Sequence, residues 1–149
     1  MARLVAAGAD KNDIYNRVFN CYSVDRMRLV GYAMDHMKVL DIEGSDTKVA
    51  LITLSRHTLA RFNFKSGDAE GIVNMPMAAT AMNYSCLMRE DKDKIKISMR
   101  SRGDRPVNGF CHDVFNGGGH LNASGGEFYG TLTEAKEAFL SHYKQYFRG

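Results

Sequence analysis

The stretch that decides the fold is Lys94-Ile95-Lys96-Ile97-Ser98-Met99-Arg100-Ser101-Arg102. Its residues alternate strictly between two kinds of side chain, as the two faces of a β-strand require. One face is apolar, whereas the other carries Lys94, Lys96, Ser98, Arg100 and Arg102. A largely apolar stretch from Met82 to Glu90 precedes it, with Asp91-Lys92-Asp93 between the two. The pattern predicts a β-hairpin with one buried face and one basic face.

Helices and further strands are predicted on both sides of this hairpin in the chain. Methionines recur at spacings of three and four after the N-cap Ser23, which indicates a helix that packs into a core. Thr131 and Glu134 have the spacing of a capping box at the start of a last helix. Helices are expected over 10–19, 24–38, a short turn after Ser55, 106–115 and from 131 onward, and strands over 48–54, 82–90, 94–102 and 126–129. We therefore expect an α+β fold, a single domain with a mixed β-sheet and helices packed mainly on one face.

Composition sets the frame for any function. A chain of 149 residues with 44% hydrophobic content suffices for one core. Its net charge of +3 is too small for bulk nucleic-acid binding, but five basic residues fall between 94 and 105 against one acid, Asp104. The three cysteines are odd in number and widely spaced, which suits a reducing cytoplasm. No apolar stretch reaches about 18 residues, so neither a membrane span nor a secretion leader is expected.

A glycine-rich run follows the basic strand and reads Phe115-Asn116-Gly117-Gly118-Gly119-His120-Leu121-Asn122-Ala123-Ser124-Gly125-Gly126. Consecutive glycines tolerate positive φ, so their N–H groups can converge on an anion as a nest, and His120 adds a side-chain donor. Taken alone, a glycine run is usually a turn, and a basic strand face is usually a solvated edge. His120 lies 18 positions beyond Arg102, with one predicted helix between them. Together, the two segments predict a phosphate-binding site.

These segments resemble a known family. The stretches 98–103, 115–120 and 123–126, together with 49–54 and Glu70-Gly71-Ile72-Val73-Asn74-Met75-Pro76, are similar to the DHH-associated domain, the C-terminal half of DHH phosphoesterases. The similarity is strongest to the nanoRNase or pAp phosphatase group, which is related to exopolyphosphatases. It implies substrate binding by Arg100, Ser101, Arg102, Gly117, Gly118, Gly119 and His120. In it, the arginines hold phosphate and sugar groups, the glycine backbone packs beside the scissile phosphate, and His120 donates to that phosphate.

The resemblance also implies that the catalytic half is elsewhere. No Asp-His-His triplet occurs in the chain, so no catalytic residue and no metal ligand is assigned to it. Residues 1–40 are interpreted as a helical lead-in that continues an absent N-terminal DHH domain, and residues 41–149 as the substrate-binding domain. Within the lead-in, 2–7 read as a short helix. Manganese or magnesium is expected in the absent domain. The expected partners are a short single-stranded oligonucleotide or nucleotide and that DHH domain, with no membrane and a homodimer left open.

Alternatives remain open at this stage. A naturally free-standing domain is one of them. The C-terminal domain of alanyl-tRNA synthetases is also similar and is a non-catalytic, RNA-binding or dimerising module, but there a long coiled-coil helix precedes the domain. A polyphosphate or cyclic-dinucleotide hydrolase of the same superfamily shares the logic of the site. A zinc site from Cys111, His112, Asp113 and His120 is disfavoured, because structural zinc sites show paired ligands at tight spacing.

Overall fold

The structure is a computed structural model that describes residues 8, 10–19 and 21–147. The helix predicted over 2–7 lies outside the described residues. The elements follow one another as α2 (Lys11–Phe19), α3 (Val24–Asp35), β1 (Lys38–Asp41), β2 (Lys48–Leu54), α4 (Arg56–Arg61), the 3-10 helix η1 (Ile72–Ala78), β3 (Tyr84–Glu90), β4 (Ile95–Ser101), α5 (Asn108–Phe115), β5 (Gly118–His120), β6 (Ala123–Phe128) and α6 (Leu132–Tyr146). None of the described helices combines the length and apolarity needed to cross a bilayer.

The six strands form one mixed sheet in the order β1-β2-β3-β4-β6-β5. β2 and β3 are parallel, and every other neighbouring pair is antiparallel. The predicted hairpin is present as β3 and β4, in which Glu90 pairs with Ile95 and Tyr84 with Ser101. The predicted strand over 48–54 is present with the same bounds. The expected α+β class with a mixed sheet is therefore confirmed.

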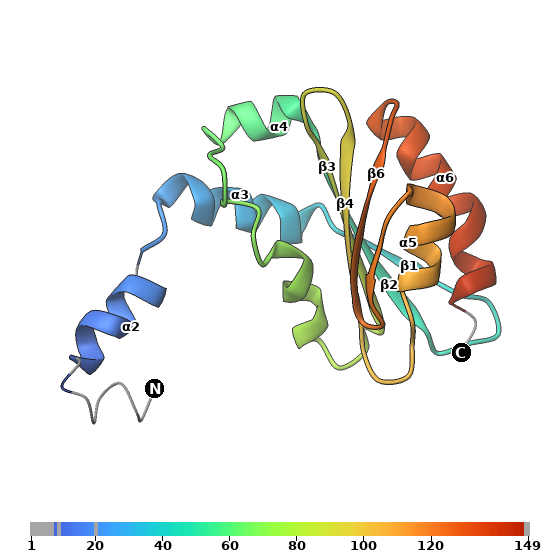
Figure 1. The fold of residues 1–149 in the computed structure, drawn as a ribbon, viewed down its shortest axis with the longest axis horizontal. Coiled ribbons are helices and arrows are strands. Elements are labelled where there is room, and N and C mark those ends of the chain that lie inside the picture. Colours follow the sequence, from blue (N-terminus) through green and yellow to red (C-terminus); the bar gives the residue numbers. More distant parts are fainter. Residues whose placement is uncertain (1–7, 9, 20, 148–149) are drawn as a thin grey trace.

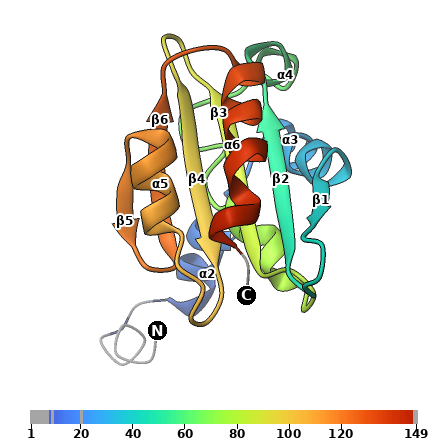
Figure 2. The same cartoon turned by 90° about the vertical axis from the view of Figure 1, so that its right-hand side faces the viewer.

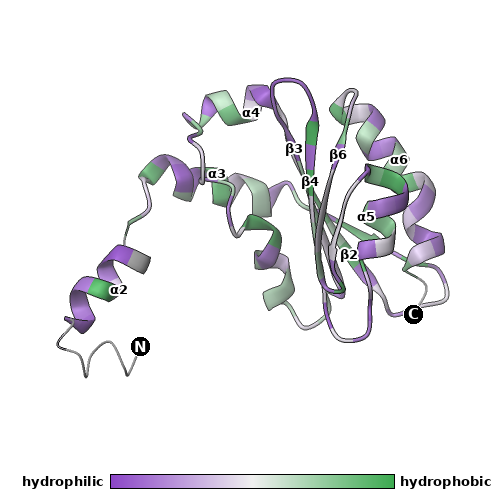
Figure 3. Ribbon diagram, viewed as in Figure 1, coloured by the Kyte–Doolittle hydropathy of each residue, from purple (hydrophilic) through white to green (hydrophobic). Residues whose placement is uncertain are grey.

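Helices pack against both faces of the sheet. In Figure 1 the sheet is seen nearly edge-on, with α5 and α6 on one side and α3, α4 and η1 on the other. Figure 2 shows α5 and α6 in front of the strands. They enclose a core that includes Ile95, Ile97 and Met99, as the alternation predicted. Figure 3 shows green, hydrophobic positions on helices of both sides.

A second, smaller core lies on the opposite face, over β2 and β3. It contains Leu29 and Ala33 of α3 together with Leu87 of β3. Among the described residues, this cluster takes none from β4, β6 or β5. α3 and most of β1 lie in the stretch 1–40 that the sequence interpretation described as a lead-in; α3 packs into this core, and β1 pairs with β2. The second face is thus covered at the β2 end of the sheet, while the basic face of β4 stays accessible.

Local sequence signals explain most helix starts. Ser23 Oγ accepts a hydrogen bond from the N–H of Arg26 at 3.1 Å, and Ser55 Oγ accepts one from Thr58 at the same distance. The capping box at α6 is complete, with Glu134 accepting from the Thr131 N–H at 2.7 Å. Such caps satisfy the unpaired N–H groups of a first turn. η1 was not predicted; it begins after Gly71, whose φ of 83° favours glycine.

Candidate phosphate-binding face

The sheet register places Arg100 and His120 in one row on the same face. Arg100 of β4 is paired with Ala123 of β6, and Ala123 is paired with His120 of β5. Directly opposite residues in a sheet point to the same side, and two strand spacings separate their Cα atoms by about 9–10 Å. Between the two lies only the methyl group of Ala123. The register thus brings together a guanidinium and an imidazole that are 20 positions apart in the sequence.

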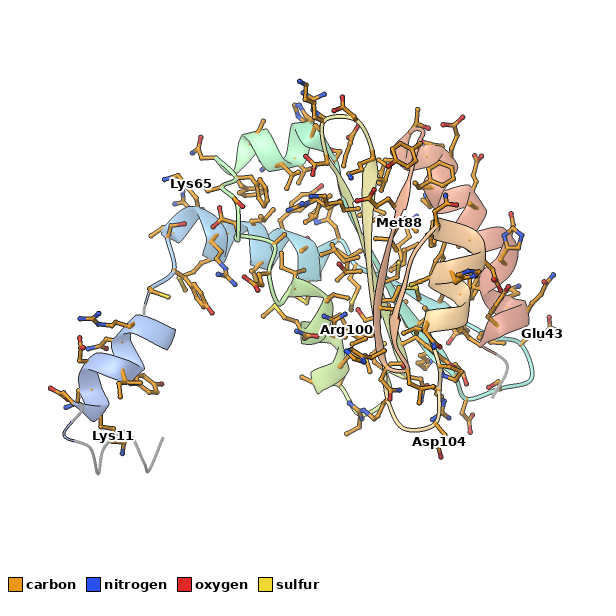
Figure 4. All side chains as sticks on the ribbon, in the orientation of Figure 1. Lys11, Glu43, Lys65, Met88, Arg100 and Asp104 are labelled. Carbon is orange, nitrogen blue, oxygen red and sulfur yellow. The ribbon has the colours of Figure 1, made fainter. Side chains whose placement is uncertain are left out.

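The neighbouring row forms a floor of small side chains. Ser98 of β4 is paired with Gly125 of β6, which is paired with Gly118 of β5. Two glycines and a serine raise nothing bulky above the backbone, so a ligand can lie close to the sheet between Arg100 and the end of β5. Figure 4 labels Arg100 on β4 in this part of the molecule. The result is a shallow, polar face with a cationic side chain at its border.

The glycine run is an edge strand and not a nest. Gly118 and Gly119 have φ values of 158° and 143° and pair with β6 in antiparallel fashion. The Gly117 N–H donates to the carbonyl of Cys111, within α5, at 3.0 Å. A Cβ on Gly117 would lie 2.0 Å from the Gly125 carbonyl oxygen, and one on Gly119 would lie 2.8 Å from that of Ala123. The glycines are therefore explained by close packing of β5 against β6, which corrects the expectation of converging N–H groups.

The charges of the basic strand divide into two groups. At the hairpin end, Lys94 Nζ lies 2.5 Å from Glu127 and Lys96 Nζ lies 3.0 Å from Asp91. The hydrogen bond from Lys94 lowers the pKa of Glu127, and the one from Lys96 lowers the pKa of Asp91. Both carboxylates therefore stay ionised and neutralise their lysines. The positive charge of this end is largely cancelled.

At the opposite end of the strand the arginines keep their charge. Among the described residues, neither Arg100 nor Arg102 forms an ion pair. Arg100 donates one hydrogen bond to the Met99 carbonyl at 2.7 Å, and Arg102 donates one to the Met77 carbonyl of η1. A guanidinium has five N–H donors, so most of them remain for a ligand. The positive face of β4 is thus concentrated at Arg100 and Arg102.

Ser101, the remaining predicted side chain, lies on the other side of β4. It is paired with Tyr84, which belongs to the core under α5 and α6. Its hydroxyl donates to the Arg105 carbonyl and accepts from Asn122 at 2.9 Å. Asn122 also donates to the Gly103 carbonyl at 2.8 Å. Ser101 therefore ties the loop after β4 to the β5–β6 turn, and the structure does not bring it to the face of Arg100 and His120.

The disfavoured zinc set is not assembled. Cys111 is fully buried in the core, and burial raises the pKa of its thiol to about 12. His112 is exposed and bonded through Nδ1 to Asp113 at 2.8 Å, while His120 is on β5. In the part of the chain that the structure describes, no three histidine, cysteine or acidic side chains are grouped to hold a metal ion.

Sequence reasoning missed the residues that shape the floor. The alternation placed Ser98 on the basic face but assigned it no role, and Ala123 was not singled out. Their importance follows from the register of β4, β6 and β5, because it sets which small residues lie between Arg100 and His120. β5 itself was not expected, since glycine is depleted in strands.

The domain therefore combines a six-stranded mixed sheet, helices on both faces, and a basic side chain on β4 beside small residues of β6 and β5. The family model described as DHHA1 domain matches residues 46–149. The chain belongs to the DHHA1 domain family, which confirms the resemblance drawn from its motifs. No protein of curated function matches the chain.

Solved structures agree with this assignment. An exopolyphosphatase-related protein from Bacteroides fragilis is 46% identical with a TM-score of 0.87, over 97% of this chain and 42% of that one. The chain thus spans less than half the length of that relative. A pGpG-specific phosphodiesterase from Vibrio cholerae is 14% identical with a TM-score of 0.56, over 81% of this chain and 38% of that one. The C-Ala domain of Aquifex aeolicus alanyl-tRNA synthetase is 14% identical with a TM-score of 0.52, over 76% of this chain and 100% of that one. At 14% identity the likeness concerns the fold alone.

Proposed function

We propose that this chain is the substrate-binding part of a metal-dependent phosphoesterase that acts on short oligonucleotides or nucleoside bisphosphates. The observation that carries the proposal is the row of Arg100 and His120 on an accessible sheet face, beside a floor of glycine and serine. The DHHA1 match supports it, as does the 46% identity to an exopolyphosphatase-related protein. The buried thiols of Cys86 and Cys111 suit a reducing compartment, and we place the protein in the cytoplasm.

Each side chain of the row has a distinct task in this proposal. The planar fork of Arg100 binds two phosphate oxygens, which an ammonium group cannot do with the same geometry. His120 is exposed and donates to the same phosphate through one ring nitrogen. Arg102 lies two residues beyond Arg100, directly after the end of β4, and contacts the adjoining sugar or phosphate. The small floor lets the phosphate approach while β5 carries His120 to it.

The chemistry of bond cleavage is assigned to the rest of the protein. Because the described residues do not group into a metal site, we place the manganese or magnesium ions in a DHH domain outside this chain. Such ions activate water and stabilise the charge of the displacement. This chain orients the ester and adds positive charge beside it. The alternative of a non-catalytic RNA-binding module has the C-Ala likeness in its favour, and that likeness concerns the fold alone.

The test measures binding of the 5′-phosphorylated dinucleotide pApA to the chain and its variants. Arg100→Ala should weaken binding by about 1.5–3 kcal/mol, which is roughly 10- to 150-fold, because a charge-assisted contact is lost. His120→Ala should also weaken it. The matched control is Lys94→Ala, which removes a cation that is already neutralised by Glu127 and should leave affinity almost unchanged. Equal affinity of Arg100→Ala, His120→Ala and the wild type, with unchanged melting temperatures, would refute the phosphate site.

A further inference from the structure

A cleft of about 340 Å³ opens on the same sheet face as Arg100, between the sheet and the loop that precedes η1. From the loop it is lined by Ala69 and Glu70, from β3 by Leu87 and Arg89, and from β4 by Lys96 and Ser98. Figure 4 labels Lys65, near the start of this loop, and Arg100 on β4. The volume is at the small end of ligand pockets, which begin at about 300 Å³. The cleft therefore suits one planar ring system.

The cleft continues directly from the phosphate-binding face. Ser98 belongs both to the cleft and to the small-residue floor, and it lies two residues from Arg100 on the same side of β4. Two residues along a strand correspond to about 7 Å. A phosphate held by Arg100 and His120 therefore has the cleft within reach of the group that it esterifies.

The chemistry of the walls selects a flat, partly apolar ligand. Leu87 and Ala69 are almost fully buried, with 4% and 9% of their surface exposed, and give an apolar base. Arg89 is held in place, because its guanidinium carbon lies 5.2 Å from the Phe64 ring centre and its Nη2 lies 3.6 Å from Asp91. A fixed guanidinium plane is a platform on which bases of single-stranded nucleic acids stack. Ser98 and Glu70 add hydrogen-bonding groups at the border.

We propose that this cleft is a nucleobase subsite, in which the base attached to the bound phosphate stacks against Arg89. The inference rests on the proposed function, since it extends the same ligand from its phosphate to its base. A second phosphate is a poorer occupant, because Arg89 and Lys96 both contact the Asp91 carboxylate. That carboxylate offsets their charge and would repel an anion, whereas it does not oppose a neutral ring.

The experiment compares adenosine 5′-monophosphate with ribose 5-phosphate, which carries the same phosphate and sugar without the base. Stacking of a base is worth about 1–3 kcal/mol, so the wild-type chain should bind the nucleotide at least about fivefold more tightly. Arg89→Lys keeps the charge and removes the plane, and should bring the two affinities together. The matched control is Arg61→Lys, since Arg61 lies over Phe62 at a similar 5.3 Å but does not line the cleft.

The outcomes separate this inference from the function on which it rests. Loss of the preference in Arg89→Lys, with its retention in Arg61→Lys and an unchanged affinity for ribose 5-phosphate, supports the subsite. Equal binding of both ligands by the wild type overturns it, and so does a preference that survives in Arg89→Lys. If Arg100→Ala binds ribose 5-phosphate as the wild type does, or if the wild type binds neither ligand at millimolar concentration, the phosphate site itself is refuted.

Discussion

Replacement of Gly117 by alanine tests the close packing of β5 most directly. The added Cβ would lie 2.0 Å from the Gly125 carbonyl oxygen, whereas ordinary contact begins at 3.4 Å, so β5 must move away by about 1.4 Å. A shift of that size breaks hydrogen bonds near 2.9 Å. Forcing an atom into a packed site costs about 1–3 kcal/mol, which lowers the Tm of a domain of this size by roughly 2–12 °C. We expect Gly117→Ala to be destabilised by that amount.

The assay is thermal and urea unfolding followed by circular dichroism, with pApA binding measured on the same preparations. Gly31→Ala is the matched control, because Gly31 lies inside α3 and an added Cβ there meets nothing within 4 Å. It should gain about 0.5–1 kcal/mol, as alanine favours a helix. Gly117→Ala should also lose affinity for pApA, since β5 carries His120. An unfolding curve of Gly117→Ala that overlays the wild-type curve would refute the packing argument.

Three further predictions concern acid stability, thiol reactivity and turnover. The Thr131 N–H and hydroxyl lower the pKa of Glu134, so this carboxylate stabilises the fold above its unfolded pKa and loses that effect as the pH falls through the lowered value. The stability difference between the wild type and Glu134→Gln should therefore shrink in acid unfolding series. Burial raises the pKa of Cys86 and Cys111, so mass spectrometry should find iodoacetamide first on the exposed Cys21 at pH 8; alkylation of the buried pair at the same rate would contradict their placement. The chain alone with Mn²⁺ should not hydrolyse pApA, and chelator-sensitive turnover that persists through purification would show a metal site within it.

The fold was predictable where the sequence pattern is local. The alternation through Lys94 to Arg102 fixed the faces of β4, and serine or threonine caps marked three helix starts. β1 was not foreseen, because its four residues form a short edge strand with little burial. η1 contains Pro76 and starts at a left-handed glycine, a combination that reads as a turn. In these segments the neighbouring sheet decides the structure, and local propensity does not.

The sequence indicated the residue types of the candidate site but not their arrangement on the sheet. Basic residues and a glycine run indicated phosphate, yet whether Arg100 and His120 share a face depends on the register across β6. One residue of slippage would turn every side chain of a strand to the other face. Because side chains alternate along a strand, Ser101 lies opposite Tyr84 and away from the row, although it stands between the predicted ligands Arg100 and Arg102 in the sequence. Residue spacing along one strand does not show how that strand is paired with two others.

The distribution of acids along β4 explains why a nearly neutral domain can present a cationic site. Asp91 in the hairpin turn and Glu127 on β6 both lie at the Lys94 end of the strand, and they neutralise two lysines there. At the other end, β6 presents Ala123 opposite Arg100, and within the described part of the chain no carboxylate forms an ion pair with the guanidinium. Replacing Ala123 by aspartate would place a carboxylate directly opposite Arg100, so that the guanidinium of the proposed site would be paired within the sheet. The uneven charge along β4 therefore depends on the acidic residues of neighbouring segments as much as on the basic residues of β4 itself.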